Sequence, residues 1–154
     1  MAYCIRDATV DDGDAMLALL PRLADFDVPP HRRAEHLWQH DAELLGRWLE
    51  GQAAQCLVQV AESGEHIVGV TLTSLRPDAL SDEPAAHLEV IVVAPGAEGG
   101  GIGRALLDAA EANARRHGAA AMTLHVIATN TRARGLYERC GYVGEMLRYI
   151  KPLD

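Results

Sequence analysis

The sequence predicts an α/β (α+β) fold, in which strands and helices pack as a single domain over residues 1–154. Three observations lead to this prediction. The length suits one domain, which buries about two thirds of the surface of its unfolded chain. Apolar residues make up 49% of the chain but include only one Phe, so the core has to consist of aliphatic side chains. Segments in which apolar and polar residues alternate, as in a strand, lie between segments in which apolar residues recur every three to four positions, as in a helix.

The N-terminal third predicts one strand and two helices. Apolar and polar residues alternate from residue 3 to residue 8, and Asp11 or Asp12 then caps a helix with a leucine-rich stripe. Pro21 has to lie near the end of this helix or kink it. After a Val-Pro-Pro break, a second amphipathic helix is expected from about residue 32 to residue 50.

The middle of the chain predicts three strands and a helix. Residues 55–62 and 66–74 predict a hairpin, because Ser63-Gly64-Glu65 between them is a favourable turn. A β-branched apolar run that begins at His87 predicts the central strand. The pattern is helical from residue 101 to residue 117.

The C-terminal part predicts another strand at 121–128, a helix that begins at Asn130, and two final strands between Tyr142 and Tyr149. The whole chain therefore predicts a sheet of about seven strands and about four helices.

A glycine-rich turn joins the central strand to the helix that follows it. Glycines at positions 99, 100, 101 and 103 allow consecutive backbone N–H groups to turn inward without obstruction by a Cβ atom. The N-terminus of the helix adds its partial positive charge at the same place. This arrangement indicates a site for a pyrophosphate.

Two common glycine loops do not fit the spacing. In a dinucleotide-binding fingerprint, Arg104 or Leu106 would stand where the last glycine is required. In a Walker loop that starts at Gly96, Ile102 and Gly103 would stand where Lys and Ser or Thr are required. What remains is x-x-Gly-x-Gly at the start of a helix, directly after a strand that ends Val-x-Pro.

This pattern resembles the phosphate loop of the acetyl-CoA-dependent N-acetyltransferase superfamily (GNAT), which reads [Arg/Gln]-x-x-Gly-x-[Gly/Ala]. Gly101-Ile102-Gly103 match its second half. The opening Ile5-Arg6-Asp7-Ala8-Thr9 is typical of the first strand of this superfamily, so the resemblance spans essentially the whole chain. A second GNAT motif, Asn-x-x-Ala-x-x-Leu-Tyr-Glu-x-x-Gly-[Phe/Tyr], is met by Asn130, Ala133, Leu136, Tyr137, Glu138, Gly141 and Tyr142.

The resemblance implies a GNAT-like fold, with a central, twisted, mixed and mostly antiparallel sheet that splays between strands four and five. It also implies acetyl-CoA as cosubstrate and coenzyme A as product, with no metal. The main-chain N–H groups of the central strand would polarise the thioester carbonyl and bind the pantetheine chain. The cofactor-binding residues expected on this basis are Ile91, Val92, Val93, Glu98, Gly99, Gly100, Gly101, Ile102, Gly103, Arg104, Asn130, Ala133 and Tyr137.

Transfer of an acyl group from a thioester to an amine needs a base and an acid. An alkylammonium with a pKa of about 10.4 is almost fully charged at pH 7, so a base must remove its proton. Glu89 is the expected base, acting through a water, because GNAT proteins often keep a carboxylate at this strand position. The alternative for Glu89 is an exposed side chain on a strand face.

Tyr137 is the expected acid, because a tyrosine hydroxyl with a pKa near 10 stays protonated and can donate to a thiolate. The alternative for Tyr137 is core packing in a helical stripe, and the alternative for Asn130 is a helix N-cap. One position departs from the GNAT pattern, because Glu98 stands where Arg or Gln is usual. A carboxylate that faced the pyrophosphate would repel it, so we expect Glu98 to turn outward and Arg104 to supply positive charge.

Composition excludes several classes of function. The net charge of −8 leaves no basic stripe for nucleic-acid binding. No apolar run approaches the ~20 residues that a membrane span needs, and the N-terminus has no signal segment, so a cytoplasmic location is expected. Three separated cysteines without a C-x-x-C pattern and scattered histidines predict neither a disulfide framework nor a metal site.

The predicted function is transfer of an acetyl group from acetyl-CoA to a primary amine of a small molecule by direct transfer. Asp78, Asp82 or Glu83, in the loop before the central strand, would help to attract the positive charge of this acceptor. Two alternatives stay open: an enzyme that acetylates a protein N-terminus or lysine, and a CoA-binding sensor without turnover. A homodimer also stays open, because similar proteins often pair through their sheets.

Overall fold

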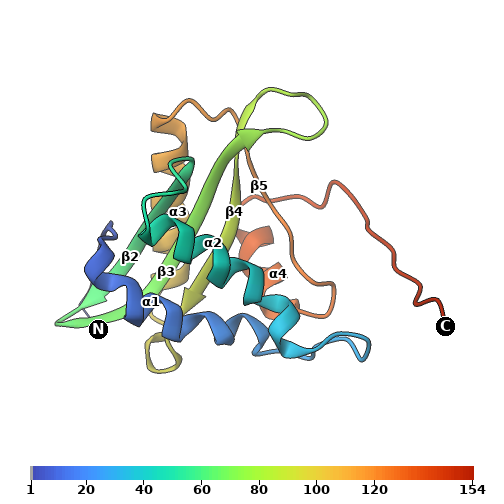
Figure 1. The fold of residues 1–154 in the computed structure, drawn as a ribbon, viewed down its shortest axis with the longest axis horizontal. Helices are drawn as coiled ribbons and strands as arrows, with labels where there is room; N and C mark the ends of the chain where they lie inside the picture. Colours follow the sequence, from blue (N-terminus) through green and yellow to red (C-terminus); the bar gives the residue numbers. More distant parts are fainter. Residues whose placement is uncertain (1) are drawn as a thin grey trace.

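The computed structural model describes residues 2–154 and has one sheet of five strands in the order β1-β2-β3-β4-β5 (Figure 1). The strands are β1 (Cys4–Asp7), β2 (Cys56–Ser63), β3 (His66–Pro77), β4 (Pro84–Val93) and β5 (Met122–Leu124). Neighbouring strands are antiparallel, except that β4 and β5 are parallel. The mixed, mostly antiparallel sheet agrees with the prediction.

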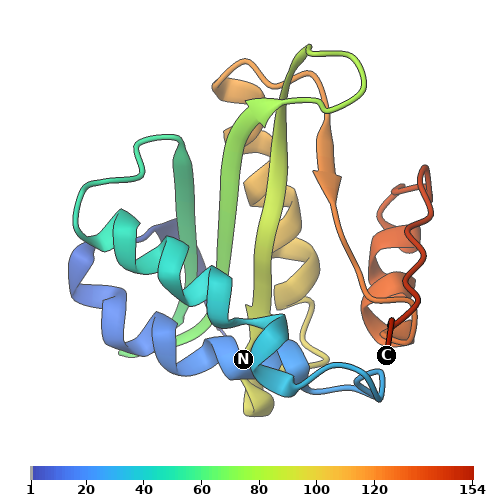
Figure 2. The same ribbon diagram turned by 45° about the vertical axis from the view of Figure 1, so that its right-hand side comes forward.

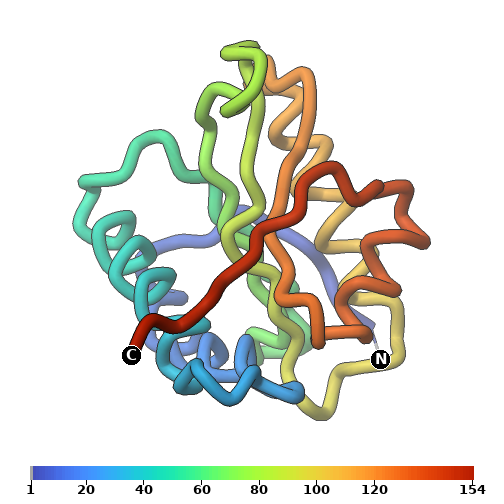
Figure 3. The backbone as a smooth tube through the Cα atoms, turned by 90° about the vertical axis from the view of Figure 1, so that its right-hand side faces the viewer, coloured from blue at the N-terminus to red at the C-terminus, as the bar shows by residue number. Residues whose placement is uncertain are grey.

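Helices cover both faces of the sheet (Figures 2 and 3). One face carries α1 (Gly13–Leu19) and α2 (Gln39–Leu49), with the short 3-10 helices η1 (Val10–Asp12), η2 (Leu20–Ala24) and η3 (Ala34–Leu37). The other face carries α3 (Ile102–Arg116) and α4 (Thr131–Arg139), and a 3-10 turn, η4 (Pro95–Ala97), precedes α3. Within residues 2–154, no helix is both long and apolar enough to cross a bilayer.

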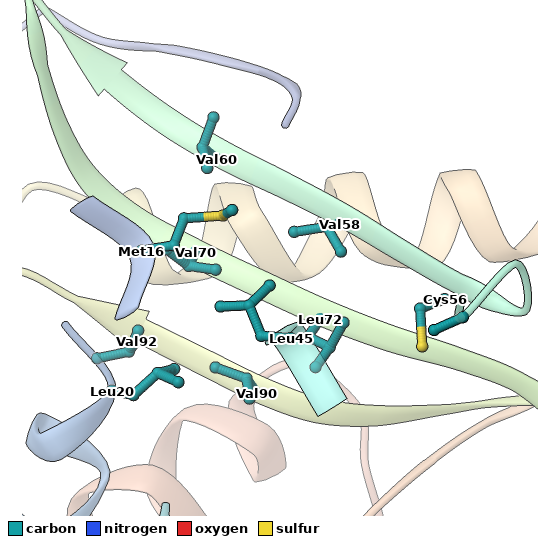
Figure 4. Close-up of a cluster of buried hydrophobic side chains, with 11 residues drawn as sticks. Met16, Leu20, Leu45, Cys56, Val58, Val60, Val70, Leu72, Val90 and Val92 are labelled. Atoms are coloured by element: carbon teal, nitrogen blue, oxygen red, sulfur yellow. The ribbon is translucent and has the colours of Figure 1, made fainter. Parts of the chain in front are cut away.

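Aliphatic side chains fill the space on both faces, as the composition predicts. The larger cluster lies between the sheet and α1/α2, where Met16, Leu20 and Leu45 pack on valines of the central strands (Figure 4). On the other face, Leu106 of α3 lies against Gly69 of β3. A Cβ atom on Gly69 would lie 2.7 Å from Leu106 Cδ1, so glycine allows this close approach.

β4 continues well beyond its pairing with β5. Only Ala86, His87 and Leu88 pair with β5, and from there to Val93 the strand pairs with β3 alone. The register between β3 and β4 shifts at this point, because Leu72 faces Val90 while Thr73 faces Leu88. Glu89 is therefore the extra residue of a β-bulge. We call the side of residues 89–93 that faces away from β3 the free side of β4, and it is the expected splay between strands four and five.

The prediction of about seven strands was wrong. Residues 142–149 form no strand, and the chain after Tyr142 runs away from the body of the protein (Figure 1). The strand expected at 121–128 is also short, since only Met122–Leu124 is paired. A strand forms only where a neighbour exchanges backbone hydrogen bonds with it, and the apolar alternation of these segments does not reveal whether such a neighbour exists.

The expected helices are present but two are shorter. The first divides at Leu20, where α1 gives way to η2 with Pro21 in its first turn, because proline has no N–H to continue the α-helical bonds. The second begins as η3, and α2 starts only after Trp38, whose φ of −143° interrupts the helical path. The count of four α-helices agrees with the prediction.

Candidate functional site

The loop between β4 and α3 contains two residues in the left-handed conformation. Gly99 and Gly101 have φ values of 84° and 82°, which residues other than glycine rarely adopt. Gly101 is the residue directly before α3, so the helix begins as soon as the chain leaves the turn. These two glycines fix the shape of the loop.

Among residues 2–154, the backbone amides of this loop have no hydrogen-bond partner. In the part of the chain that the structure describes, no backbone acceptor lies within hydrogen-bond range of the amides of residues 98–104. The first amide that bonds back is that of Ala105, which donates to the Gly101 carbonyl oxygen at 3.0 Å. A run of unpaired backbone N–H groups at the start of a helix can bind an anion.

Two further amides lie on the free side of β4. The Ala94 N–H donates to the Val68 carbonyl oxygen at 2.8 Å, across the β3–β4 pair. Because backbone groups alternate in direction along a strand, the amide of Val92 also points to β3, whereas Ile91 and Val93 point to the free side. A contact of Arg22 supports this orientation, since its Nε donates to the Val93 carbonyl oxygen at 2.9 Å from outside the β3–β4 pair.

Glu98 is held between two arginines from other elements. Its carboxylate pairs with Arg22 of η2, and its Oε2 lies 3.0 Å from Nη1 of Arg132 at the start of α4. Arg104, which we expected to supply positive charge, is exposed on α3 and has no ion-pair partner in residues 2–154. The positive charge at the loop thus comes from Arg22 and Arg132. Sequence reasoning missed both, because they are far from the loop in sequence and belong to no motif.

Glu89 lies in a polar cluster on the α1/α2 side. Its Oε1 is 3.3 Å from Arg76 Nη2 and 3.6 Å from His87 Nε2, and its side chain is only 16% exposed. His87 Nδ1 lies 2.7 Å from Thr123 Oγ1, and its ring packs on His125 with the centroids 4.7 Å apart. Burial, together with the charge of Arg76, lowers the pKa of His87 to about 4, so the ring is neutral at pH 7.

Asp41 of α2 adds a second carboxylate to this region. Burial, reinforced by the negative charge of Glu89, raises the pKa of Asp41 to about 7. Sequence reasoning missed Asp41, because the helical pattern does not distinguish it from the other polar residues of α2. The carboxylates of Asp41 and Glu89 repel each other, so a cation placed near both would be favourable.

α4 positions Asn130 and Tyr137. The Asn130 Oδ1 accepts a hydrogen bond from the Ala133 N–H at 3.3 Å, so this asparagine is the N-cap of the helix. Tyr137 packs with Leu88 on the α3 side, and its ring meets Tyr142 edge-on with the centroids 6.0 Å apart. Burial raises the pKa of Tyr137 to about 12, so its hydroxyl stays protonated at neutral pH. Tyr137 and Glu89 therefore lie on opposite faces of the sheet, with the free side of β4 between them.

The acidic loop before β4 lies away from the glycine loop. Asp78, Asp82 and Glu83 form the tip of the β3–β4 hairpin, at the opposite end of β4 from the glycine loop (Figure 1). The Asp78 carboxylate accepts from the Leu80 N–H at 3.2 Å and from the Ser81 hydroxyl at 3.0 Å. Asp78 thus stabilises the turn itself.

Residues 20–142 match the model of the Acetyltransferase (GNAT) family, which is more than half of the chain. The protein belongs to the GNAT family. Both the glycine loop and the Asn130–Tyr142 motif lie within the matched region. Within residues 2–154, no group of three or more His, Cys, Asp or Glu side chains could hold a metal ion.

Two similar curated proteins have names that describe acetyltransferases. The uncharacterized N-acetyltransferase YhfO of Bacillus subtilis (strain 168) is 31% identical over 138 residues, which cover 90% of this chain and 88% of that protein. A mycothiol acetyltransferase of Jonesia denitrificans is 31% identical over 142 residues, which cover 90% of this chain but 42% of that protein. The chain thus spans less than half the length of this second relative.

A solved structure has a similar fold. It is AAC(6′)-Iy in complex with the bisubstrate analog CoA-S-monomethyl-acetylneamine, with a TM-score of 0.72 and 21% identity. The superposition covers 99% of this chain and 100% of that one. The family model and the names of the relatives support an acetyltransferase.

Proposed function

We propose that this GNAT protein is an N-acetyltransferase that moves an acetyl group directly from acetyl-CoA to a primary amine of a small molecule. The observation that carries the proposal is the run of unpaired amides at residues 98–104, at the end of the free side of β4. Such amides suit the diphosphate of coenzyme A. Ile91 and Val93 offer further N–H and C=O groups for the amides of the pantetheine chain.

The residues around β4 can serve each step of the transfer. Acetyl-CoA supplies the activated acyl group, and the amine nitrogen forms a C–N bond with the carbonyl carbon while the C–S bond breaks. Glu89 removes the proton of the ammonium through a water. The Ile91 N–H, on the free side of β4, stabilises the negative charge on the carbonyl oxygen, since the strand already fixes it, and the Val93 groups remain for the pantetheine chain. Tyr137 donates its proton to the leaving thiolate, because burial keeps its hydroxyl protonated.

The charges near Glu89 support a cationic acceptor. Asp41 and Glu89 are both carboxylates, and His87 beside them carries no charge at pH 7. An ammonium group placed near Asp41 and Glu89 would relieve their repulsion. The names of the mycothiol acetyltransferase and of the bisubstrate complex are also consistent with small-molecule acceptors.

One observation favours the second candidate, a CoA-binding sensor without turnover. Arg22 holds the Val93 carbonyl and the Glu98 carboxylate, both of which border the proposed cofactor path. Arg22 has to leave Val93 before that carbonyl is free for pantetheine. A protein that used this contact to report cofactor occupancy would need no acceptor.

The experiment that separates these functions measures thiol release. The protein is incubated with acetyl-CoA and a panel of polyamines, aminoglycosides, amino acids and peptides, and free thiol is followed over time. Release with a small amine, and acetylated amine in the product, supports the proposal. Release only with peptides indicates a protein acceptor, and saturable CoA binding without release on any acceptor indicates a sensor.

Two substitutions test the roles of Glu89 and Tyr137. Tyr137→Phe should lower kcat with little change in CoA affinity, while Tyr149→Phe in the exposed C-terminal segment serves as control. Glu89→Gln should change the pH dependence of kcat, while Glu43→Gln, an exposed position on α2, should not. An unaltered rate for Tyr137→Phe removes Tyr137 from the acid role, and an unaltered pH profile for Glu89→Gln places the base elsewhere.

A further inference from the structure

Glu98 joins two arginines that come from the two faces of the sheet. One of its carboxylate oxygens pairs with Arg22 of η2, and the other lies 3.0 Å from Nη1 of Arg132 in the first turn of α4. The side chains of Glu98 and Arg22 are 28% and 22% exposed, whereas that of Arg132 is 73% exposed. Arg132 is thus the arginine that can leave Glu98 for another anion with little rearrangement.

Arg132 stands at the unfavourable end of its own helix. It is the second residue of α4, and the first turn of this helix contains no acidic residue. A cation near a helix N-terminus opposes the partial positive charge there, whereas an anion at the same place is favourable. Residues that break such a local rule are expected at functional sites. An anion bound by Arg132 would relieve its repulsion from the helix.

The face of α4 that carries Arg132 is turned to the glycine loop. Leu136 lies one turn after Arg132 on the same face, and its Cδ2 would be 3.6 Å from a Cβ atom on Gly103. Among the described residues, no amide of the loop donates to the Glu98 carboxylate, which accepts its hydrogen bond from Arg22. The loop amides are therefore free for an anion, while the guanidinium group beside them is occupied.

We infer that Arg132 is the side-chain ligand of the CoA diphosphate, that Glu98 occupies Arg132 until the cofactor binds, and that Arg22 retains Glu98 afterwards. The inference rests on the proposed function, because it takes coenzyme A as the ligand of the loop. The planar fork of a guanidinium matches phosphate oxygens and binds them more strongly than neutral donors do. With Arg22 as its remaining partner, Glu98 repels the diphosphate less. Arg132 is then a cofactor ligand, and Arg22 is a positioning residue that acts through Glu98.

The change of partner by Arg132 costs little. An exposed ion pair changes an equilibrium by no more than about fivefold, so Glu98 lowers the CoA affinity only by a small factor. A charge-assisted contact with phosphate, added to those of the loop amides, outweighs this factor. Arg132 thus supplies the charge that the Arg or Gln of the GNAT pattern would supply at position 98.

Calorimetric titration with CoA tests the role of Arg132 without an acceptor and without turnover. Arg132→Gln should weaken CoA binding about tenfold. Arg134→Gln, which removes the same charge from an exposed position of the same helix, should change it less than about twofold. The weakening by Arg132→Gln should be at least as large in the Glu98→Gln background, because Glu98 then no longer competes for Arg132.

Two results would overturn the role of Arg132. One is an equal CoA affinity of Arg132→Gln and Arg134→Gln. The other is an effect of Arg132→Gln that disappears in the Glu98→Gln background, since Arg132 would then act only by holding Glu98. Circular dichroism at the temperature of the titration verifies that each variant is folded.

The same pair of backgrounds tests Arg22, for which the opposite coupling is expected. Arg22→Gln should weaken CoA binding a few-fold in the parent protein, because Glu98 then faces the loop without its retaining partner. In the Glu98→Gln background, Arg22→Gln should not weaken binding. An equal weakening in both backgrounds would mean that Arg22 contacts the ligand itself, and the positioning role would be wrong.

A second ligand identifies the phosphate group that Arg132 binds. Dephospho-CoA has the diphosphate but lacks the 3′-phosphate, so Arg132→Gln should weaken its binding by the same factor as that of CoA. An unchanged affinity of Arg132→Gln for dephospho-CoA assigns Arg132 to the 3′-phosphate and overturns the inference. Any of these contrary results, obtained with saturable CoA binding, leaves the proposed function intact. A parent protein that does not bind CoA overturns both.

Discussion

Replacing Gly101 by Ala tests whether the glycine loop binds the cofactor. Gly101 has φ of 82°, and a Cβ atom added there meets no atom within 4 Å. The variant therefore has no steric clash inside the protein, and its cost is the left-handed conformation alone, about 1–2 kcal/mol. The new methyl group would lie in the loop whose amides we propose to bind the diphosphate.

Gly118 provides a matched control at the other end of α3. Its φ is 88°, and a Cβ atom there also meets nothing within 4 Å. Gly101→Ala and Gly118→Ala should therefore lose similar stability, about 1–2 kcal/mol each, which lowers the Tm of a domain of this size by roughly 2–8 °C. Only Gly101→Ala should weaken CoA binding, by tenfold or more, which corresponds to about 1.4 kcal/mol.

The assays are thermal unfolding followed by circular dichroism and CoA titration by calorimetry. Equal CoA affinities of the two variants, at equal loss of stability, would refute the reasoning. Such a result would mean that the loop is shaped by its glycines but does not contact the ligand.

Three further predictions concern charged groups. Because the folded-state pKa of Asp41 is raised to about 7, the protein should lose stability as the pH rises from about 4 to about 7. Asp41→Asn should lack this loss when Tm is measured at pH 5 and pH 8. The same change in Tm between these pH values for the variant and the parent protein would contradict the prediction. The Arg6 guanidinium holds the pKa of Asp12 at about 2, so Asp12→Asn should lower the free energy of unfolding in urea by about 2 kcal/mol at pH 7. This difference between the variant and the parent protein should vanish as the pH falls from about 4 to about 2. A difference that does not change with pH would show that the ion pair is not its cause. Glu98→Gln should tighten CoA binding a few-fold at low salt, and less at high salt, because it removes a negative charge from the loop. The control is Asp25→Asn, which removes the other, exposed carboxylate partner of Arg22. Weaker CoA binding by Glu98→Gln would mean that Glu98 orders the loop.

The sequence predicts most of the fold because local patterns determine most of its elements. The turn at Ser63-Gly64-Glu65 joins β2 and β3 in an antiparallel pair, and Gly64 has the positive φ that such a turn requires. Gly118 ends α3 with φ of 88°. Residues 142–149 have the same kind of strand pattern, yet form no strand. Whether a segment pairs with a neighbouring strand depends on the tertiary structure, which the local alternation of apolar and polar residues does not determine.

The candidate site could be predicted where its chemistry follows from backbone conformation or from a motif. Gly99 and Gly101 are in the left-handed region, as an inward-turned loop requires, and Asn130 is the N-cap that its alternative role predicts. The partners of Glu98 could not be predicted, because Arg22 and Arg132 reach it from separate elements of the fold. Long-range ion pairs depend on the tertiary structure, and a single sequence carries no signal for them.

The most direct test of the central claim is an NMR titration of ¹⁵N-labelled protein with coenzyme A. If the amides of residues 98–104 hold the diphosphate, the signals of Gly99, Gly101 and Gly103 should shift strongly and saturate together. The signals of Gly64 and Gly118, which lie in distant turns, should remain unchanged. Saturable CoA binding that leaves the three loop glycines unshifted would contradict the account.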